Sequence, residues 1–345
     1  MKRYGNLYSK VYNMINLQKA HQNAQKGKKW YKEVQKVNQN TEYYLKELQN
    51  RLINKAYRTS EYEIFIKNDS GKEREIYKLP YFPDRIAQWA IMQVIEPILE
   101  KKLIYDTYSA IPNRGIHLGL ERLHQAMEDR EANKYCLKMD VKKYYPSINH
   151  DILKQIYRKI FKDPNLLWLL DEIIDSTAGD AGIPIGNYLS QWSGNIYLAY
   201  FDHWMKEEMK CERYFRYMDD IVVLHHNKEF LHNLKRRVGD YLAKNLKLKI
   251  KGNWQVFPTY ERGVDFLGYR SFGGYTLLRK STAKKFKRKM RKIQKKDKLD
   301  DHSYMSINSY RGWLKWCNSY NLEQKYIKPL EGKIKEYERV NNICK

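Results

Sequence analysis

Two short β-rich runs meet at a pair of adjacent acids, and this feature limits the folds open to the chain more than any other. The runs are residues 214–217 and 221–224, and Met218, Asp219 and Asp220 separate them. Their β-branched and aromatic residues favour strands, so the segment predicts a hairpin with two carboxylates at its bend. Two adjacent like charges cost stability unless a cation offsets them. The hairpin therefore predicts a site for a cation.

A third acid lies on the polar side of another predicted strand, residues 135–141. Apolar side chains at alternate positions share one face of this strand, whereas Lys138 and Asp140 share the other. Phosphoryl transfer uses carboxylates that hold two divalent ions roughly 4 Å apart, and Mg²⁺ prefers such oxygen ligands. Asp140, Asp219 and Asp220 form a set of this kind if the two strands are neighbours in one sheet. Acids at turns are often merely solvated, and this alternative stays open for each acid taken alone.

The charge of the chain indicates its partner. The 345 residues include 65 Lys and Arg against 40 Asp and Glu, a formal net charge of +25. This charge would repel itself in a compact protein unless a polyanion offset it, and nucleic acid is the expected polyanion. No run of about 18 apolar residues predicts a membrane helix. No signal-peptide pattern follows the first residues, so we expect a cytoplasmic protein with no membrane partner.

Another predicted hairpin is strongly charged. Residues 62–67 and 74–79 flank a polar turn at 68–71 and predict two paired strands. Lys67 and Arg74 then lie near the tip.

Apolar residues at helical spacing predict helices in four other parts of the chain. These parts span residues 7–58, 85–104, 190–210 and 281–298; Asp84 is expected to cap the second, and a loop at 182–186 to precede the third. The first and last parts are rich in Lys and Arg. Their apolar stripes are Leu45, Leu48 and Leu52 in the first part, and Phe286, Met290 and Ile293 in the last.

The acidic segments resemble the catalytic blocks of reverse transcriptases. Residues 217–220 are similar to the tyrosine-x-aspartate-aspartate signature of that family, and residues 137–145 resemble its first catalytic block. The resemblance implies two bound Mg²⁺ ions, with Mn²⁺ as a substitute. The metal ligands that it implies are Asp140, Val141, Asp219 and Asp220.

The same resemblance assigns residues to a dNTP site. Tyr145 matches the aromatic residue that stacks under the sugar and excludes a 2′-hydroxyl. Lys67 and Arg74 resemble the cations that clamp the triphosphate. Without the resemblance, Tyr145 would be a core aromatic and the two cations exposed hairpin charges. These alternatives stay open.

Motifs later in the chain resemble the primer grip and the thumb of the family. Phe266, Leu267, Gly268 and Tyr269 are similar to the hairpin that grips the primer, and the basic helix follows where a thumb is expected. The side chains expected to bind nucleic acid there are Lys284, Lys285, Arg288, Lys289, Arg291 and Lys292.

The order of the motifs implies an α+β fold of the right-hand polymerase type. Such a fold has fingers, a palm with an antiparallel sheet and a short helical thumb, preceded here by a basic helical segment. The limits expected are 1–58 for the basic segment, 59–134 and 150–190 for the fingers, 135–149 and 191–270 for the palm, and 271–345 for the end of the primer grip and the thumb.

The loop that precedes the third helix indicates a subtype. Ile185 precedes Gly186, and the segment ends with Ser190 and Gln191, a pattern that resembles the reverse transcriptases of diversity-generating retroelements. In that family a template RNA is copied with frequent errors opposite adenine. Because Ile185 can neither donate nor accept a hydrogen bond, a polar check on base pairing is weakened. The residues expected to form this fidelity loop are Pro184, Ile185, Gly186, Ser190 and Gln191, with Ile185 and Gly186 also at the dNTP.

The subtype implies partners and leaves alternatives open. The expected partners are the template RNA, the RNA–DNA hybrid with its cDNA, dNTPs, and a pentameric basic accessory protein. A reverse transcriptase of a phage-defence or CRISPR-associated system is one alternative, and a non-catalytic RNA-binding protein is another. The lysine that assists the leaving pyrophosphate is Lys249 or Lys251, unless Trp254 occupies that position.

Overall fold

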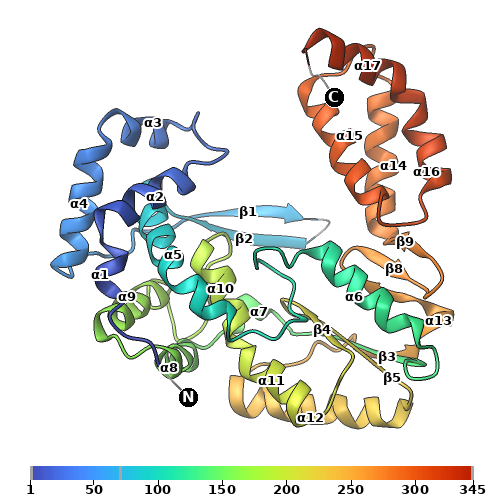
Figure 1. Ribbon diagram of the computed structural model, residues 1–345, viewed down its shortest axis with the longest axis horizontal. Helices are drawn as coiled ribbons and strands as arrows, with labels where there is room; N and C mark the ends of the chain where they lie inside the picture. The colour runs from blue at the N-terminus through green and yellow to red at the C-terminus, as the bar shows by residue number, and fades with distance from the viewer. Residues whose placement is uncertain (1–2, 70–71, 343–345) are drawn as a thin grey trace. The chain divides into compact units, whose positions relative to one another are not determined.

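The computed structural model describes residues 3–69 and 72–342 and divides into two compact units (Figure 1). No helix in these described ranges is long and apolar enough to cross a membrane. Unit 1 comprises Met1–Asn113, Met139–Glu212 and Leu234–Asn253, and unit 2 comprises Arg114–Lys138, Arg213–Asn233 and Trp254–Lys345.

Four helices form the N-terminal part of unit 1. The predicted stripe is confirmed, because Leu45, Leu48 and Leu52 are all buried. The side chain of Asn13 caps the second helix by accepting from the backbone N–H of Ile15. The helices are α1 (Tyr8–Val11), α2 (Met14–Ala24), α3 (Lys32–Gln39) and α4 (Thr41–Ile53).

The predicted charged hairpin forms, but its strands extend into the predicted turn at 68–71, because Asn68 and Asp69 belong to the first strand. Strands β1 (Glu63–Asp69) and β2 (Lys72–Lys78) pair antiparallel, with Lys67 directly opposite Arg74. Of the predicted turn, Ser70 and Gly71 lie outside the described residues.

The expected cap of the next helix is wrong. Asp84 lies inside a short π-helical turn, η1 (Tyr81–Arg85), and α5 (Ile86–Glu100) begins after it. Asp84 is buried, and its carboxylate accepts hydrogen bonds from the Tyr57 hydroxyl (2.8 Å) and the Ser60 backbone N–H (3.1 Å). The acid therefore joins distant segments of unit 1. It does not satisfy the first turn of its own helix.

The helix predicted from 190 to 210 is two helices. The break lies at Leu198 (φ −96°, ψ 0°), between α10 (Tyr188–Tyr197) and α11 (Ala199–Glu207). Neither Pro nor Gly lies at this break, and the apolar spacing continues across it. For this reason the local sequence predicts one helix. Other helices of this region are α7 (Tyr144–Ser147), α8 (His150–Ile160), α9 (Pro164–Ile174) and α12 (Lys228–Leu246).

Unit 2 contains most of a four-stranded sheet. Its strand order is β4-β5-β3-β6, with antiparallel pairing between β4 and β5 and between β3 and β6. The last two residues of β3 belong to unit 1. The apolar run Ile221–Leu224 is buried, as its composition predicts. The strands are β3 (Tyr135–Asp140), β4 (Tyr214–Tyr217), β5 (Asp220–His225) and β6 (Gln255–Pro258).

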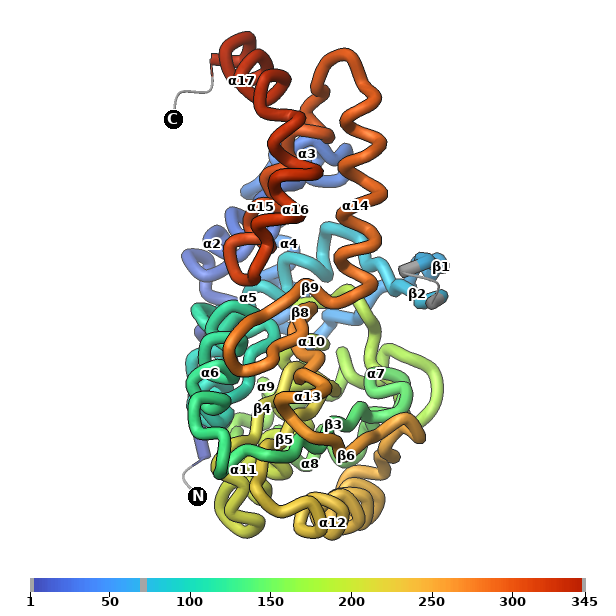
Figure 2. Tube along the Cα trace, turned by 90° about the vertical axis from the view of Figure 1, so that its right-hand side faces the viewer, coloured from blue at the N-terminus to red at the C-terminus, as the bar shows by residue number. Residues whose placement is uncertain are grey.

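A small sheet and a helical bundle complete unit 2. Figure 2 shows α14 running beside α15 and α16. The predicted stripe Phe286, Met290 and Ile293 is buried, although α14 ends at Gln294 and not at 298. The elements are α6 (Ile116–Glu128), α13 (Thr259–Arg262), β7 (Val264–Phe266), β8 (Tyr269–Ser271), β9 (Thr276–Leu278), α14 (Lys280–Gln294), α15 (Asp301–Leu314), α16 (Tyr320–Tyr326), η2 (Lys328–Leu330) and α17 (Glu331–Val340).

Candidate active site

The β4–β5 hairpin carries two of the predicted acids. Tyr217 pairs with Asp220, so Met218 and Asp219 form the bend and Asp220 opens β5. Asp219 and Asp220 are both half-buried. Met218 has a φ of +52°, a left-handed conformation that costs a non-glycine residue about 1–2 kcal/mol. A bend held in this conformation needs support from its surroundings.

Arg216 gives that support, and its role was not predicted. The residue is fully buried (0% exposed), and its Nη1 donates a hydrogen bond of 3.0 Å to the carbonyl of Met218. A buried guanidinium is costly unless it is well partnered, so its presence indicates a specific role. The sequence held a signal: Arg216 is the one charged residue in the otherwise aromatic run 214–217.

A lysine contacts the second acid of the hairpin. Nζ of Lys138 lies 2.6 Å from Oδ1 of Asp220, and both side chains are partly buried. The same ammonium lies 5.6 Å from the centre of the Phe266 ring. Burial raises the pKa of the neighbouring Cys136 thiol to about 12, so this cysteine stays protonated. Asp220 therefore already has a cationic neighbour, and a metal ion bound there would compete with Lys138.

The segment after β3 pairs with residues 249–251. The backbone N–H of Lys251 donates to the Asp140 carbonyl, and that of Lys142 donates to the Lys249 carbonyl, both at 2.8 Å. Between these bonds, Val141 and Ile250 form an antiparallel bridge. Residues directly opposite in such pairing have side chains on one face, so Lys251 lies opposite Asp140. Lys249 lies one step further along the same face.

Trp254, the remaining candidate at that position, has a different environment. It lies in unit 2, after the paired segment, and its ring packs edge-on against His232 at 5.9 Å.

Tyr145 and the predicted fidelity loop are joined through their backbones. The N–H of Ile183 donates to the Tyr145 carbonyl (3.1 Å), and the N–H of Tyr77 in β2 donates to the Ile185 carbonyl (3.2 Å). The Tyr145 ring is half-buried, and its hydroxyl lies 3.5 Å from the position of a Cβ at Gly194. Unit 1 thus brings Tyr145, the loop and the charged hairpin together.

Glycine is required within this loop. Gly186 has a φ of +120°, and a Cβ there would lie 3.4 Å from the Tyr77 carbonyl oxygen. Both observations favour glycine, because other residues rarely adopt this φ. Of the remaining loop residues, Pro184 and Ser190 are buried, Ile185 is half-buried and Gln191 is exposed.

The two cations predicted to clamp the triphosphate lie on neighbouring strands of the charged hairpin. Lys67 and Arg74 are both exposed and directly opposite each other across β1 and β2. Like charges at directly opposed positions destabilise a strand pair. A triphosphate bound between the two cations would offset their repulsion.

Residues 66–271 match the family model described as Reverse transcriptase (RNA-dependent DNA polymerase). This match covers more than half of the chain. The chain belongs to the reverse transcriptase family. The expected fold, with helices around an antiparallel sheet, is confirmed.

Relatives of this reverse transcriptase are distant. Protein YkfC of Escherichia coli (strain K12) is 22% identical over 249 residues, which cover 60% of this chain and 65% of YkfC. The group II intron-encoded protein LtrA of Lactococcus lactis subsp. cremoris is 24% identical over 195 residues, 53% of this chain and 32% of LtrA. The chain therefore spans less than two thirds of the length of either relative.

A solved telomerase shares the fold. The telomerase from Candida albicans, in complex with a TWJ fragment of telomeric RNA, has a TM-score of 0.50 and 10% sequence identity. The likeness covers 88% of this chain and 66% of the telomerase.

The hairpin predicted to grip the primer is buried at its side chains. Phe266, Leu267 and Tyr269 are all buried, and the Tyr269 hydroxyl donates to the Trp313 carbonyl (3.0 Å). Gly268 lies so close to the Trp313 ring that a Cβ would clash at 2.5 Å. The side chains of this hairpin therefore pack against α15.

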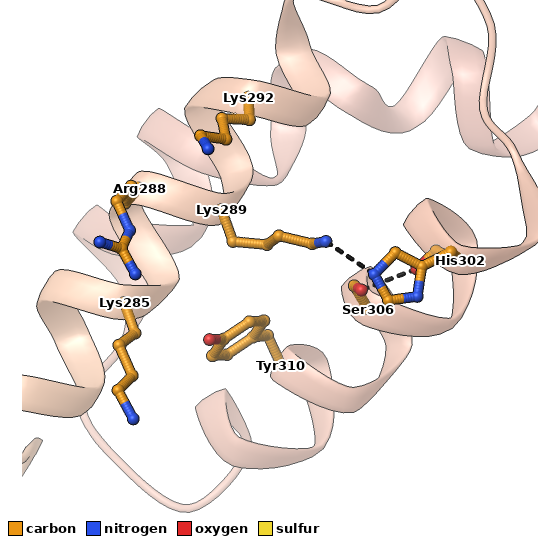
Figure 3. Close-up of a pocket in the computed structure, with 7 residues that line it drawn as sticks. All are labelled: Lys285, Arg288, Lys289, Lys292, His302, Ser306 and Tyr310. Carbon is orange, nitrogen blue, oxygen red and sulfur yellow. Dashed lines mark hydrogen bonds between the residues drawn. The ribbon is translucent and has the colours of Figure 1, made fainter. Parts of the chain in front are cut away.

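The basic helix α14 lines a cavity of about 530 Å³ together with α15 (Figure 3). No acidic side chain from the described part of the chain lines it. Lys289 Nζ lies 3.0 Å from His302 Nε2, so this histidine nitrogen accepts from the ammonium. Arg291 instead turns to α16 and donates to the Tyr326 hydroxyl (3.2 Å), while Lys284 is exposed outside the cavity. The lining residues are Lys285, Arg288, Lys289, Lys292, His302, Ser306 and Tyr310.

The predicted metal site is not assembled as a cluster of ligands. Among residues 3–69 and 72–342, no group of three or more His, Cys, Asp or Glu side chains is placed to hold a metal ion. The donor chemistry nevertheless suits Mg²⁺, because carboxylate oxygens are its preferred ligands and Asp220 already attracts a cation. Asp140, Val141, Asp219 and Asp220 remain predicted ligands.

Proposed function

We propose that the chain is an RNA-directed DNA polymerase that uses Asp140, Asp219 and Asp220 to hold two Mg²⁺ ions. The observation that carries this proposal is the family match over residues 66–271, which includes all three acids. The β4–β5 hairpin supports it, because Asp219 stands at a bend that the buried Arg216 holds in place. Bound ions would lower the pKa of the attacking 3′-hydroxyl and stabilise the leaving pyrophosphate.

The chain's own residues supply binding and orientation in this proposal. Lys67 and Arg74 pair with phosphate oxygens of the dNTP, since guanidinium and ammonium groups suit that contact. Tyr145 supports the sugar, and its position is fixed by the backbone bond to Ile183.

Incorporation of dNTPs on an RNA template tests the proposal. The wild type should extend an annealed DNA primer with Mg²⁺, and Asp219→Ala should not. Equal background in both proteins would instead support a non-catalytic RNA-binding protein, the alternative that the charge of +25 leaves open. Weaker binding at higher salt is expected in either case, so it does not discriminate.

We also propose Lys251 as the proton donor to the leaving pyrophosphate. Its position opposite Asp140 supports this choice over Lys249, which lies opposite Lys142. Lys251→Ala should slow the maximal rate of incorporation about tenfold or more, as expected when a general acid is lost. Lys249→Ala is the matched control and should retain most of the rate. The opposite result would exchange the two roles.

We further propose the diversity-generating subtype, in which the copying is error-prone opposite adenine and serves to diversify a target gene. Ile185, half-buried with its carbonyl bound to β2, supports this because it presents no polar group to the base pair. Ile185→Gln should lower misincorporation opposite adenine in primer extension, and Ile185→Leu should leave it unchanged. An unaltered error spectrum in Ile185→Gln would favour a phage-defence or CRISPR-associated enzyme. A pentameric basic accessory protein belongs to this proposal.

A further inference from the structure

A short segment after α9 contacts two parts of unit 1 to which the proposed function gives separate roles. One part is the β1–β2 hairpin, whose cations are assigned to the triphosphate, and the other is the 182–187 loop, which carries Ile185 and precedes α10. The segment consists of Ser176 and Thr177 and is here called the 176–177 hub. No sequence motif indicated a role for it, and the proposed function does not use it.

The first hub residue binds the root of the hairpin. The hydroxyl of Tyr62, the residue directly before β1, lies 2.7 Å from Oγ of Ser176. Because Ser176 donates its own proton to the Ile173 carbonyl (2.6 Å), Tyr62 is the donor of this bond. Burial raises the pKa of Tyr62, which keeps its hydroxyl protonated. The Tyr62 ring also packs edge-on against Tyr77 of β2 at 5.6 Å, so this residue connects the hub to the second strand of the hairpin.

The second hub residue binds the start of the loop together with a buried histidine. The Thr177 hydroxyl and Nε2 of His150 both donate to the Gly182 carbonyl, each at 2.8 Å. His150 is 3% exposed, and its Nδ1 lies 3.6 Å from Oδ1 of Asp175, so both nitrogens of the ring face oxygen atoms. Gly182 has a φ of +109°, and a glycine backbone rotates easily. The two donors therefore fix the direction in which the loop begins.

The loop returns to the hairpin through β2. The N–H of Tyr77 donates to the Ile185 carbonyl at 3.2 Å. Contacts therefore run from the hub through Tyr62 to β2, from β2 to the loop, and from the loop at Gly182 back to the hub. Packed side chains and hydrogen bonds that form such a continuous set can carry energetic coupling between their ends. A change at one contact should therefore be felt at the others.

We propose that the 176–177 hub fixes the loop relative to the hairpin, and that Tyr62 and His150 are positioning residues for nucleotide selection. The proposal rests on the proposed function, in which the hairpin holds the triphosphate and Ile185 lies at the base pair. A shift of the loop by about 1 Å would misplace this side chain relative to the nucleotide. Neither Tyr62 nor His150 touches the nucleotide in this proposal, so both act through the residues that they hold.

The ratio of kcat/KM for correct and incorrect dNTPs tests the proposed role, because this ratio does not depend on the fraction of folded enzyme. Tyr62→Phe removes only the hydroxyl, and His150→Leu removes both ring nitrogens. Each should lower the ratio about three- to tenfold, the effect of one lost hydrogen bond. His150→Gln keeps an N–H donor and should restore most of the ratio. The matched control is Tyr8→Phe, which removes a buried hydroxyl that donates to the Leu52 carbonyl, and it should leave the ratio unchanged.

Hydrogen exchange of the full chain without substrates tests the hub separately from catalysis. The amides to follow are those of Ile183, which donates to the Tyr145 carbonyl, and of Tyr77, which donates to the loop. Tyr62→Phe and His150→Leu should each speed the exchange of both amides about three- to tenfold, because the contacts are coupled through the hub. Tyr8→Phe should leave both rates unchanged.

Three outcomes would overturn the proposal. If each variant speeds exchange only at the amide on its own side, the hub does not couple hairpin and loop. If exchange is faster but the ratio of kcat/KM values is unchanged, Tyr62 and His150 are purely structural. An equal fall of the ratio in Tyr8→Phe would likewise remove their specific role. Absence of incorporation by the wild type, with both amides responding in the variants, would instead reject the polymerase function and support the coupling through the hub.

Discussion

The β1–β2 hairpin and the β4–β5 hairpin are both antiparallel strand pairs, but they lie in opposite surroundings. The first is exposed, with Ile66 66% accessible and two cations opposed across its strands. The second is buried along Ile221–Leu224 and carries acids at its bend. A buried hairpin fixes its carboxylates closely, whereas an exposed one can adjust to a nucleotide. We therefore expect activity to depend mainly on the exact position of the acids, and dNTP binding mainly on the charge of the cations.

The largest effect is expected at the acids of the buried hairpin. Asp220→Asn should lower dNTP incorporation by about 10³-fold or more, since a metal ligand supplies several kcal/mol of transition-state stabilisation. Asp240→Asn, an exposed acid on α12, is the matched control and should retain activity. Single-turnover rates measure both, and similar rates for the two variants would break the comparison.

The support that Arg216 gives to the bend should contribute to the free energy of unfolding. Arg216→Leu leaves the Met218 carbonyl without its 3.0 Å donor, so unfolding in urea should be easier by about 1–3 kcal/mol. Incorporation should fall as well, because Asp219 stands on the same bend. Arg216→Lys should lie between the two proteins. An unchanged unfolding midpoint in Arg216→Leu would mean that the bend needs no side-chain support.

Substitutions of the cations on the exposed hairpin should weaken dNTP binding without lowering the stability of the protein. Lys67→Ala and Arg74→Ala should each raise the KM for dNTP about tenfold, the loss of one charge-assisted contact. The melting temperature of Lys67→Ala should stay level or rise, because this change removes a like-charge pair. A lower melting temperature with an unchanged KM would make these cations structural.

The smallest effect is expected at the apolar surface of β1. Ile66→Thr should change the free energy of unfolding by no more than about 0.5 kcal/mol, as for other surface substitutions. The matched change in the buried hairpin, Val222→Thr, buries a hydroxyl and should cost about 1–3 kcal/mol. Equal costs at the two positions would remove the distinction between the hairpins.

Residue type and spacing predicted the structural features that depend on residues close together in the sequence. Both hairpins and the apolar stripes of α4 and α14 follow from residue type and spacing, and the structure confirms them. The Lys138–Asp220 contact spans 82 positions and the Asp84–Tyr57 contact 27, so no local pattern indicates them. The same limit explains the wrong cap at Asp84.

Burial was the harder property to predict at the candidate site. The motif at 266–269 predicted a primer contact, but packing against Trp313 covers its side chains. Likewise, Arg291 shares the basic face of α14 in sequence but turns to Tyr326 of α16. Partners distant along the chain decide which side of a motif reaches solvent.

The number of divalent ions held by the assembled complex tests the central claim most directly. Mn²⁺ binding can be measured by electron paramagnetic resonance with RNA template, a chain-terminated DNA primer and the matching dNTP. The account predicts about two ions per complex in the wild type and at least one fewer in Asp140→Asn. The same number in both proteins would contradict the assignment of Asp140, Asp219 and Asp220 as a shared metal site.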